Sequence, residues 1–264
     1  MNKTTLAIIG ITSSFFTLHS AFAEPGYWLM GISGGYAERR SNVAVNLLYQ
    51  NPAPALSGMP ATFLIQDYED SGPLWGILVG YQAQCENWIL GGEISADWGS
   101  FAEDHPFAFS DFDAMSGGFG LGWSGSFRYK RDVTIAFTAR MGYVLESLRY
   151  FVPPIFIPYV RAGFEVSKDT LQATYFGDPN VFPFSSSSQQ SSWPYRFIAG
   201  VGVEFPVIDT NISIRFEYDY HTSGQTIETQ STIFGNPALV TPNFITAMDP
   251  VTNSGKISFV WNFY

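Results

Sequence analysis

The sequence predicts an all-β protein, a closed antiparallel barrel of eight strands that crosses a membrane. The first observation is strict alternation. In residues 211–221 the even positions are apolar or aromatic and the odd positions are polar or charged, which gives a strand two unlike faces. The second is that no apolar run of about eighteen residues follows the first 23, so helices cannot span a membrane. The third is composition, with 14% charged and 17% aromatic residues, because soluble proteins carry about 25% charged residues.

Residues 1–23 are predicted to be a secretory signal peptide. Lys3 supplies a positive start, residues 6–18 are mostly apolar, and Ala21-Phe22-Ala23 forms a small-x-small cleavage site before Glu24. Residues 24–264 then form a single β-barrel domain. The chain holds 13 Lys and Arg against 23 Asp and Glu, and this acidic balance argues against a nucleic-acid partner.

The alternation recurs in eight segments, which are the predicted strands. They are residues 27–38, 74–84, 88–98, 134–146, 159–167, 193–205, 211–221 and 256–264. The links between them alternate in length: 85–87 and 206–210 are short, 146–158 is medium, and 39–73, 100–123, 168–192 and 222–254 are predicted to be long loops. With both chain ends in the periplasm, the short turns face inward and the long loops lie outside, as in bacterial outer-membrane barrels.

One stretch leaves the strand count open. The odd-numbered apolar phase runs from Phe119 through Trp123 and Tyr129 into the strand at 134–146. This run is longer than the roughly ten residues that a membrane crossing needs. Either one strand projects above the bilayer, or residues 129–132 form a turn and the barrel has ten strands. No Gly, Asn or Pro marks a turn there, so one long strand is favoured.

The polar faces of these strands predict which side of the barrel faces lipid. Besides Gly, Ser and Thr, they carry four arginines and four glutamates: Arg140, Arg161, Arg196, Arg215, Glu93, Glu165, Glu204 and Glu217. Such balance is typical of a sealed interior, where each ion needs a partner. Trp and Tyr near the strand ends resemble membrane girdles. We therefore expect apolar residues to face lipid, and an ion network to plug the lumen. A small porin and a secreted sandwich of opposite orientation are the alternatives.

Several short motifs resemble a known family. They are Gly26–Trp28, Thr138–Tyr143, Pro158–Gly163, Arg215–Tyr218 and Phe259–Tyr264. The chain resembles the eight-stranded outer-membrane β-barrel proteins related to the transmembrane domain of outer membrane protein A and to the opacity-type surface antigens. The resemblance implies outer-membrane localisation and a terminal strand read by the barrel-assembly machinery. Here Phe259, Trp261 and Phe263 share a face while Tyr264 falls on the other, one position away from the usual pattern.

Candidate chemistry is sparse. His221 and Ser223, with Glu228 as orienting carboxylate, are similar to the His-x-Ser pattern of outer-membrane lipid A deacylases. Two observations oppose this interpretation. Gly224 departs from that pattern, and the alternation of the strand places the side chains of His221 and Ser223 in the lumen rather than against lipid. A structural ion network is the better interpretation of Glu217 and Asp219. Asp104-His105 is interpreted as solvated loop, and Cys85 as an unpaired thiol. We expect no catalysis, no cofactor and no metal site.

The predicted function is therefore a structural or surface-contact role in the outer membrane. The expected partners are outer-membrane lipid including lipopolysaccharide, the barrel-assembly machinery, and host or other envelope proteins reached by the loops. Apolar loop segments at 43–49 and 232–240 either pack over the barrel mouth or bind a partner. Residues 185–192, rich in Ser and Gln, are expected to be flexible and hydrated.

Overall fold

The fold is a single closed ring of antiparallel strands. The computed structural model describes residues 26–50, 60–99, 102–110, 122–146, 155–177, 185–232 and 241–263. The strands are β1 (Tyr27–Gln50), β2 (Pro60–Cys85), β3 (Trp88–Gly99), β4 (Asp104–Ser110), β5 (Gly122–Tyr143), β6 (Leu145–Glu146), β7 (Ile155–Gly177), β8 (Ser185–Ser192), β9 (Tyr195–Pro206), β10 (Ile212–His221), β11 (Ile227–Thr232), β12 (Thr241–Met248) and β13 (Val251–Phe263). Within the described residues, no helix has the length and apolar character needed to cross a membrane.

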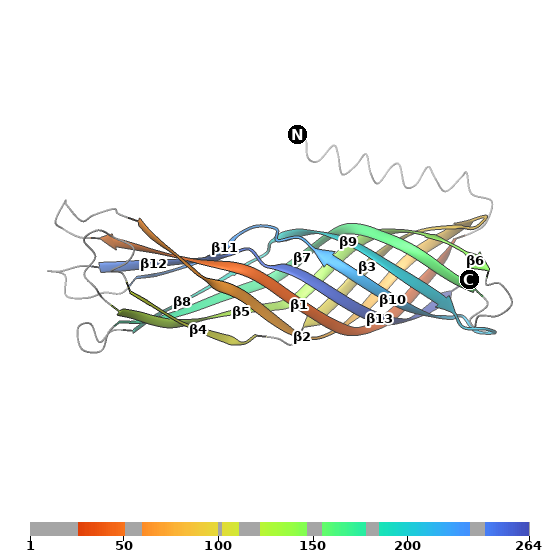
Figure 1. The fold of residues 1–264 in the computed structure, drawn as a ribbon. Coiled ribbons are helices and arrows are strands. Elements are labelled where there is room, and N and C mark those ends of the chain that lie inside the picture. The colour runs from red at the N-terminus through yellow and green to blue at the C-terminus, as the bar shows by residue number, and fades with distance from the viewer. Residues whose placement is uncertain are drawn as a thin grey trace, which may run out of the picture.

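Eight strands close the ring in the order β1-β2-β3-β5-β7-β9-β10-β13, and β13 pairs back onto β1 from Arg40↔Val251 to Trp28↔Phe263. The predicted count of eight is confirmed, and β5 is one long strand rather than two. The C-terminus lies at the end of the barrel that carries β6 and the short turns, and the long hairpins extend from the opposite end (Figure 1). This is the predicted alternation of short and long connections.

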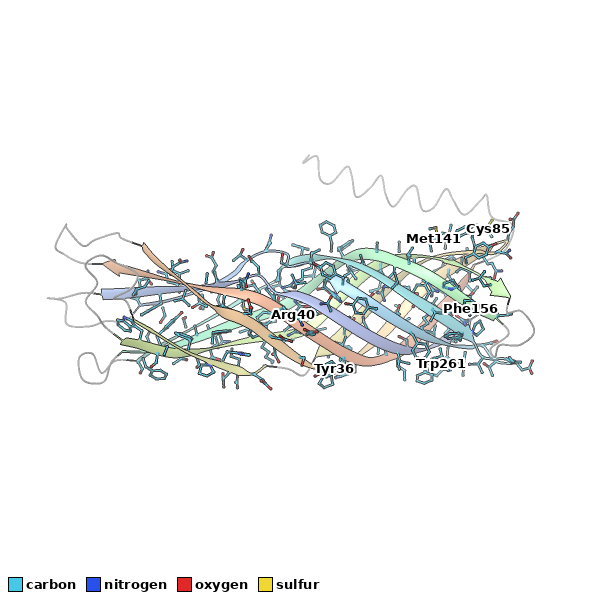
Figure 2. All side chains as sticks on the ribbon, in the orientation of Figure 1. Tyr36, Arg40, Cys85, Met141, Phe156 and Trp261 are labelled. Carbon is cyan, nitrogen blue, oxygen red and sulfur yellow. The ribbon has the colours of Figure 1, made fainter. Side chains whose placement is uncertain are left out.

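The predicted orientation is also confirmed. Large apolar side chains stand on the outer face, where Phe137, Phe197 and Phe216 are exposed, while Arg140 and Arg215 are buried inside. Figure 2 shows side chains such as Met141 and Trp261 on the outside of this wall. An apolar outer surface of this extent is compatible with hydrocarbon rather than water. We call this zone the membrane belt.

The four predicted long loops are wrong over much of their length, because the strands continue through them. β1 and β2 run on to Gln50 and back from Pro60. β4, β8, β11 and β12 prolong β3, β9, β10 and β13 beyond short interruptions. The Ser- and Gln-rich segment predicted to be flexible is β8, paired with Asp169–Phe176 of β7. We call the strand portions beyond the membrane belt the head.

The loops were mispredicted because the two faces of the strands exchange character between belt and head. On β1 the outward residues change from Trp28 and Ile32 to Glu38 and Arg40, while the inward residues become Val43 and Val45. β7 changes in the same way, with exposed Phe164 giving way to exposed Lys168. The outer face meets hydrocarbon in the belt and water in the head, so the apolar residues move to the inside.

β5 also has apolar residues outside in the belt and inside in the head, but a β-bulge conceals this change in the sequence pattern. The pairing register with β7 shifts between Arg131 and Thr134, which inserts an extra residue and reverses the parity of the faces. Trp123 and Phe127 are buried inside the head, whereas Ile135 and Phe137 are exposed on the belt. The unbroken odd-numbered apolar phase of the sequence therefore belongs to two opposite faces.

The head is built as two four-stranded sheets packed face to face. One sheet has the order β2-β1-β12-β11 and the other β4-β5-β7-β8. Their shared core consists of Val43, Val45, Leu47, Tyr68, Phe107, Trp123, Phe127, Tyr129, Leu171, Ala173, Tyr175, Ile227, Phe244 and Met248. Phe244 joins the sheets by stacking on Tyr175 with ring centroids 4.3 Å apart and by an edge contact with Trp123. Burial raises the pKa of Tyr175 to about 12, as expected for a phenol in an apolar core.

Packing therefore accounts for the apolar residues Val43, Val45 and Leu47 of segment 43–49. Of segment 232–240, all but Thr232 at the end of β11 lies outside the described residues. Where the two sheets meet at β8 and β11, hydroxyl groups link them: Ser186 Oγ lies 2.7 Å from Ser231 Oγ, and Thr229 donates to Ser188 at 3.0 Å.

Within the described residues, no backbone pairing joins β2 to β4. Pro106 in β4 lacks an N–H and so blunts that edge against strand addition.

The exchange of faces predicts opposite outcomes for neighbouring substitutions. Val45→Asp places a carboxylate in the core of the head and should destabilise it by about 3 kcal/mol or more. Ala44→Asp points outward into water and should change stability by less than about 0.5 kcal/mol. Proteinase K digestion of intact cells measures the difference, since only Val45→Asp should expose the head to cleavage. Equal resistance of the two variants would contradict the assignment of inner and outer faces.

Candidate functional site

The candidate site is the ionic interior of the barrel. All eight charged residues predicted to plug the lumen are buried there, on β3, β5, β7, β9 and β10. Each lies on the inward face because strand parity turns it away from the apolar outer face. The buried set is larger than predicted, with seven basic and eight acidic side chains among the described residues. The additional members are Arg39, Asp70, Asp97, Arg131, Asp169 and Lys256, together with Asp219, which was expected in an ion network but not counted among the eight.

The layer nearest the periplasm is a four-membered ring of alternating charge. Arg140 donates to Glu93 at 3.3 Å and to Glu204 at 2.7 Å. Arg215 donates to the same two carboxylates, at 2.6 Å and 3.0 Å. Arg140 also lies over the ring of Tyr159, 4.2 Å from its centroid. Each ion therefore has two partners of opposite sign, which offsets the cost of removing it from water.

The middle layer joins β3, β7, β10 and β13. Arg161 donates to Glu217 at 2.9 Å and lies 3.6 Å from Asp219. Lys256 contacts Asp97 at 3.1 Å and Asp219 at 3.4 Å. Asp219 therefore links the two cations and ties the ends of the layer together.

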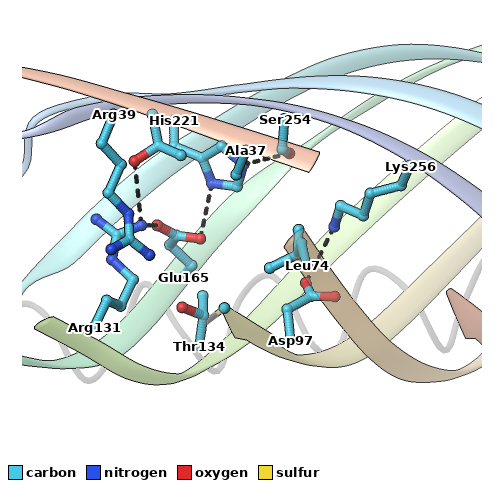
Figure 3. A pocket seen from close by; sticks show the side chains of 12 residues that line it. Ala37, Arg39, Leu74, Asp97, Arg131, Thr134, Glu165, His221, Ser254 and Lys256 are labelled. Atoms are coloured by element: carbon cyan, nitrogen blue, oxygen red, sulfur yellow. Dashed lines mark hydrogen bonds and ion pairs between the residues drawn. The ribbon is translucent and has the colours of Figure 1, made fainter. Parts of the chain in front are cut away.

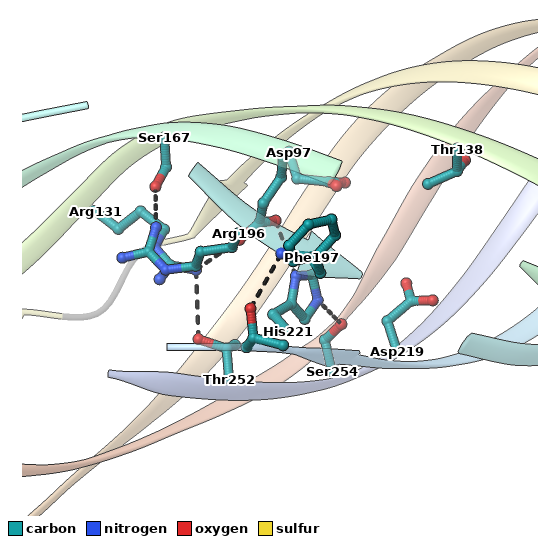
Figure 4. Close-up of polar contacts among 12 residues, drawn as sticks. Asp97, Arg131, Thr138, Ser167, Arg196, Phe197, Asp219, His221, Thr252 and Ser254 are labelled. Carbon is teal, nitrogen blue, oxygen red and sulfur yellow. Dashed lines mark hydrogen bonds and ion pairs between the residues drawn. The ribbon is translucent and has the colours of Figure 1, made fainter. Parts of the chain in front are cut away.

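The outer layer lies at the junction of belt and head. Arg196 pairs with Asp169 and donates to Ser167 Oγ at 2.6 Å, as Figure 4 shows for the serine contact. Arg131 lies 3.3 Å from Asp169 and 3.5 Å from Glu165. This layer is continuous with the aromatic core above it, because Tyr129 donates to Asp169 at 2.6 Å.

Glycines on the inner faces make room for these long side chains. A Cβ at Gly200 would collide with the carboxylate of Asp219 and come within 3.0 Å of Arg161 Cγ. A Cβ at Gly80 would lie 2.8 Å from Glu93 Cγ. The narrow barrel therefore has room for its charged side chains because the neighbouring strands carry glycine at these positions.

His221 has different partners from those predicted. Its Nδ1 lies 2.8 Å from Glu165 Oε2 and its Nε2 lies 3.3 Å from Ser254 Oγ. Ser223 lies in the segment after β10, where its carbonyl accepts from Arg196 Nε at 3.2 Å. Glu228 is exposed on β11. The structure thus does not bring Ser223 and Glu228 together with His221, because β10 ends at His221 and the chain leaves the lumen face there.

The Ser254–His221–Glu165 arrangement borders a small polar cavity (Figure 3). The cavity has a volume of about 20 Å³, and Arg39, Arg131 and Lys256 also line it. This is enough for about one water molecule. The order of the three groups matches that of an acyl-transfer triad, in which a carboxylate orients a histidine beside a hydroxyl.

The other predicted positions are placed as follows. Phe259, Trp261 and Phe263 are exposed together on the outer face of β13, whereas Tyr264 and the cleavage residues Ala23 and Glu24 lie outside the described residues. Cys85 is a half-buried free thiol at the end of β2. No group of His, Cys, Asp and Glu suited to a metal ion occurs in the described ranges.

Asp104 and His105 are in strand β4 rather than in a solvated loop. Asp104 pairs with Arg128 on β5 at 2.9 Å. The His105 ring stacks on Phe127 and makes an edge contact with Tyr68. His105 therefore packs in the head, whereas Asp104 forms an exposed ion pair on its surface.

Sequence reasoning missed members of the network for three reasons. Arg39, Asp70 and Asp169 fell in predicted loops, where no inner face was expected. Arg131 fell on the odd-numbered face of the predicted long strand, which the bulge between Arg131 and Thr134 turns inward. Asp97 and Lys256 lie on predicted strands, and their parity with Glu93 and Ser258 was a sufficient signal to include them.

These features define a membrane-spanning β-barrel whose interior holds a buried network of salt bridges. A family model described as an outer membrane protein beta-barrel domain matches residues 11–263, and the chain belongs to this family. It is an outer-membrane β-barrel protein. The comparison with curated proteins gives no match.

The solved structures to which the chain is similar are distant. Neisserial surface protein A (NspA) is 11% identical over 91% of this chain and 100% of its own, with a TM-score of 0.38. OprG from Pseudomonas aeruginosa is 12% identical over 91% and 98%, with a TM-score of 0.37. Ail of Yersinia pestis is 13% identical over 89% and 98%, with a TM-score of 0.32.

The four-membered ring predicts strong coupling between Glu204 and Arg215. Glu204→Leu leaves two buried guanidinium groups sharing one carboxylate and should destabilise the barrel by about 3–5 kcal/mol. Glu204→Leu with Arg215→Met leaves a neutral Arg140–Glu93 pair and should recover much of that loss. Urea unfolding in detergent micelles, followed by tryptophan fluorescence, measures both. Glu69→Gln, on the exposed outer face, is the control. Additive losses in the double variant would contradict the ring.

Proposed function

We propose that this protein is a surface-contact protein, in which the belt anchors the molecule and the head presents its hairpins to the cell's surroundings. The exchange of strand faces carries the proposal. A strand that continued above the bilayer with an apolar outer face would aggregate in water. Here the outer face turns polar and the inner face packs into a core, which supports a head that stays folded in water.

The head supports contact at a distance from the lipid. From Glu38 to Gln50, β1 has about 40 Å of strand at roughly 3.3 Å per residue. The two sheets hold it as a stiff stalk, because aromatic side chains from both sides interlock in its core. Scaffolded hairpin ends of this kind commonly carry binding residues. The partners we propose are host or other envelope proteins.

Transport fits the interior less well. Three layers of ion pairs cross the lumen, and the cavity between two of them holds about one water. This supports a plug in preference to a small porin. Export through the signal peptide 1–23, and recognition of the aromatic final strand by the barrel-assembly machinery, complete the proposal.

A variant without its head tests the proposed function. Residues 39–71, 102–130, 170–191 and 224–250 are replaced by short turns, so that the belt and its ionic ring remain. This variant should still show the heat-dependent shift in electrophoretic migration of a folded barrel. Chemical cross-linking on intact cells exposed to host-cell surfaces should give adducts with the full protein and lose them with the headless one. Equal adducts from both proteins would contradict the proposal.

One observation favours a second candidate, acyl-ester hydrolysis. In this reaction Ser254 Oγ attacks the ester carbonyl carbon while His221 Nε2 takes the hydroxyl proton. The proton passes to the leaving alcohol as the ester bond breaks, and water then hydrolyses the acyl-serine. Glu165 would hold the histidine in the required orientation at 2.8 Å. The one-water cavity opposes this candidate, because an ester must approach Ser254.

Labelling with an alkyl fluorophosphonate separates the two candidates. A nucleophilic Ser254 would displace fluoride and gain the phosphonyl group, which mass spectrometry detects. The surface-contact function predicts an unlabelled protein. Label that disappears in Ser254→Ala and persists in Ser223→Ala would establish the hydrolase instead. A folded, unlabelled wild type would end the hydrolase candidate.

A further inference from the structure

The outer surface of the head is electrostatically two-sided. On the sheet β4-β5-β7-β8, the outward residues Lys130 and Lys168 are exposed. On the opposite sheet, β1 and β2 present Glu38, Asp67 and Glu69, with Arg40 as the basic residue among them. β1 and β7 are four places apart in the eight-membered ring, so the basic and acidic walls face opposite directions.

The two lysines stand at the upper edge of the membrane belt. Just below them, Ile135 of β5 lies opposite Val166 of β7, and Phe137 stacks on Phe164 with ring centroids 5.2 Å apart. Tyr195 on the neighbouring strand is exposed at this level and pairs with Val166. Aromatic side chains of this kind mark the boundary between hydrocarbon and lipid headgroups. Lys130 and Lys168 therefore reach the headgroup layer.

The charge at this level is positive after its internal pairs are taken into account. Lys130 Nζ lies 2.5 Å from Asp132 Oδ1, and Lys168 Nζ lies 4.0 Å from Asp132 Oδ2. One carboxylate thus serves two ammonium groups. The next cation above them, Arg128, is neutralised by Asp104 at 2.9 Å. The lysine side chains are 58% and 46% exposed, so both can turn toward an anion.

A neutral hydrogen-bonding surface continues above the lysines. On the outer face, Thr170 of β7 lies opposite Ser191 of β8, with their hydroxyl oxygens 2.9 Å apart. The next pair on that face is Gln172 and Gln189, and both are exposed. Hydroxyl and amide groups of this kind donate to and accept from sugar hydroxyls.

We propose that this wall binds a phosphorylated, multiply acylated glycolipid of the outer leaflet, the chemical class of lipopolysaccharide. From the belt upward, the wall presents apolar, basic and neutral hydrogen-bonding groups, in the same sequence as the acyl chains, phosphates and sugars of such a molecule. Acyl chains lie on the apolar belt, a phosphate group bridges Lys130 and Lys168, and sugars contact the amides and hydroxyls of β7 and β8. The acidic wall of β1 and β2 repels the same phosphates. The proposal is independent of what the hairpin ends contact.

Titration of the purified full-length protein in a neutral detergent tests the site. Hexa-acylated lipid A with both phosphates is added, and native mass spectrometry measures bound lipid. Lys130→Gln with Lys168→Gln should weaken binding about tenfold or more, as expected for loss of two charge-assisted contacts. Arg40→Gln, a charge loss on the opposite wall, should bind as the wild type does. Heat-dependent electrophoretic migration verifies that each variant is folded.

Three further arms identify the ligand chemistry. Lys130→Arg with Lys168→Arg should retain binding, since the charge is kept. Lipid A without phosphates should bind the wild type about as weakly as phosphorylated lipid A binds the double glutamine variant. Phosphatidylglycerol should not compete at equal concentration. Equal weakening by Arg40→Gln, unchanged binding in the double glutamine variant, or equal competition by phosphatidylglycerol would each overturn the proposal.

Discussion

The structure depends on one constraint, that every backbone amide in hydrocarbon must be paired within the protein. β13 meets β1 along thirteen residue pairs and closes the ring, which leaves no strand edge inside the belt. Closure with eight strands makes a narrow interior that side chains must fill. Arginine and glutamate fill it here, and their pairing across five strands ties opposite walls of the ring together.

Once these strands leave the membrane, their outer faces contact water instead of hydrocarbon. In β1 and β7 the alternation of inward and outward residues continues unbroken from belt to head, and the residue types on the two faces change instead. In β5 a bulge shifts the alternation by one residue, so that odd-numbered residues face inward in the head and outward in the belt. At the junction, Tyr129 connects the two regimes, since its hydroxyl binds Asp169 of the ionic interior and its ring belongs to the apolar core. The head is thus a water-adapted sandwich that shares its strands with a lipid-adapted barrel.

Sequence patterns were sufficient for the belt but not for the head. The alternation in residues 211–221 gave the orientation of β10 and the inward position of Arg215 and Glu217, because one rule holds along the whole membrane crossing. The head was mistaken for loops because Val43 and Val45 lie on the face that carries Ser33 and Ser41 lower down. The partners of His221 depended on which strands meet across the lumen, and a pattern within single strands holds no such information. Ser254 on β13 is an example.

Spin labels along β1 test the exchange of faces most directly. In a Cys85→Ser background, single cysteines at Ile32, Ala44 and Val45 are labelled in lipid vesicles, and collision rates with oxygen and with a water-soluble nickel chelate are measured. The label at Ile32 should meet mainly oxygen, the label at Ala44 mainly nickel, and the label at Val45 little of either. Nickel access at Ile32 equal to that at Ala44 would contradict the account, because the two residues share one outer face and differ only in the solvent that meets it.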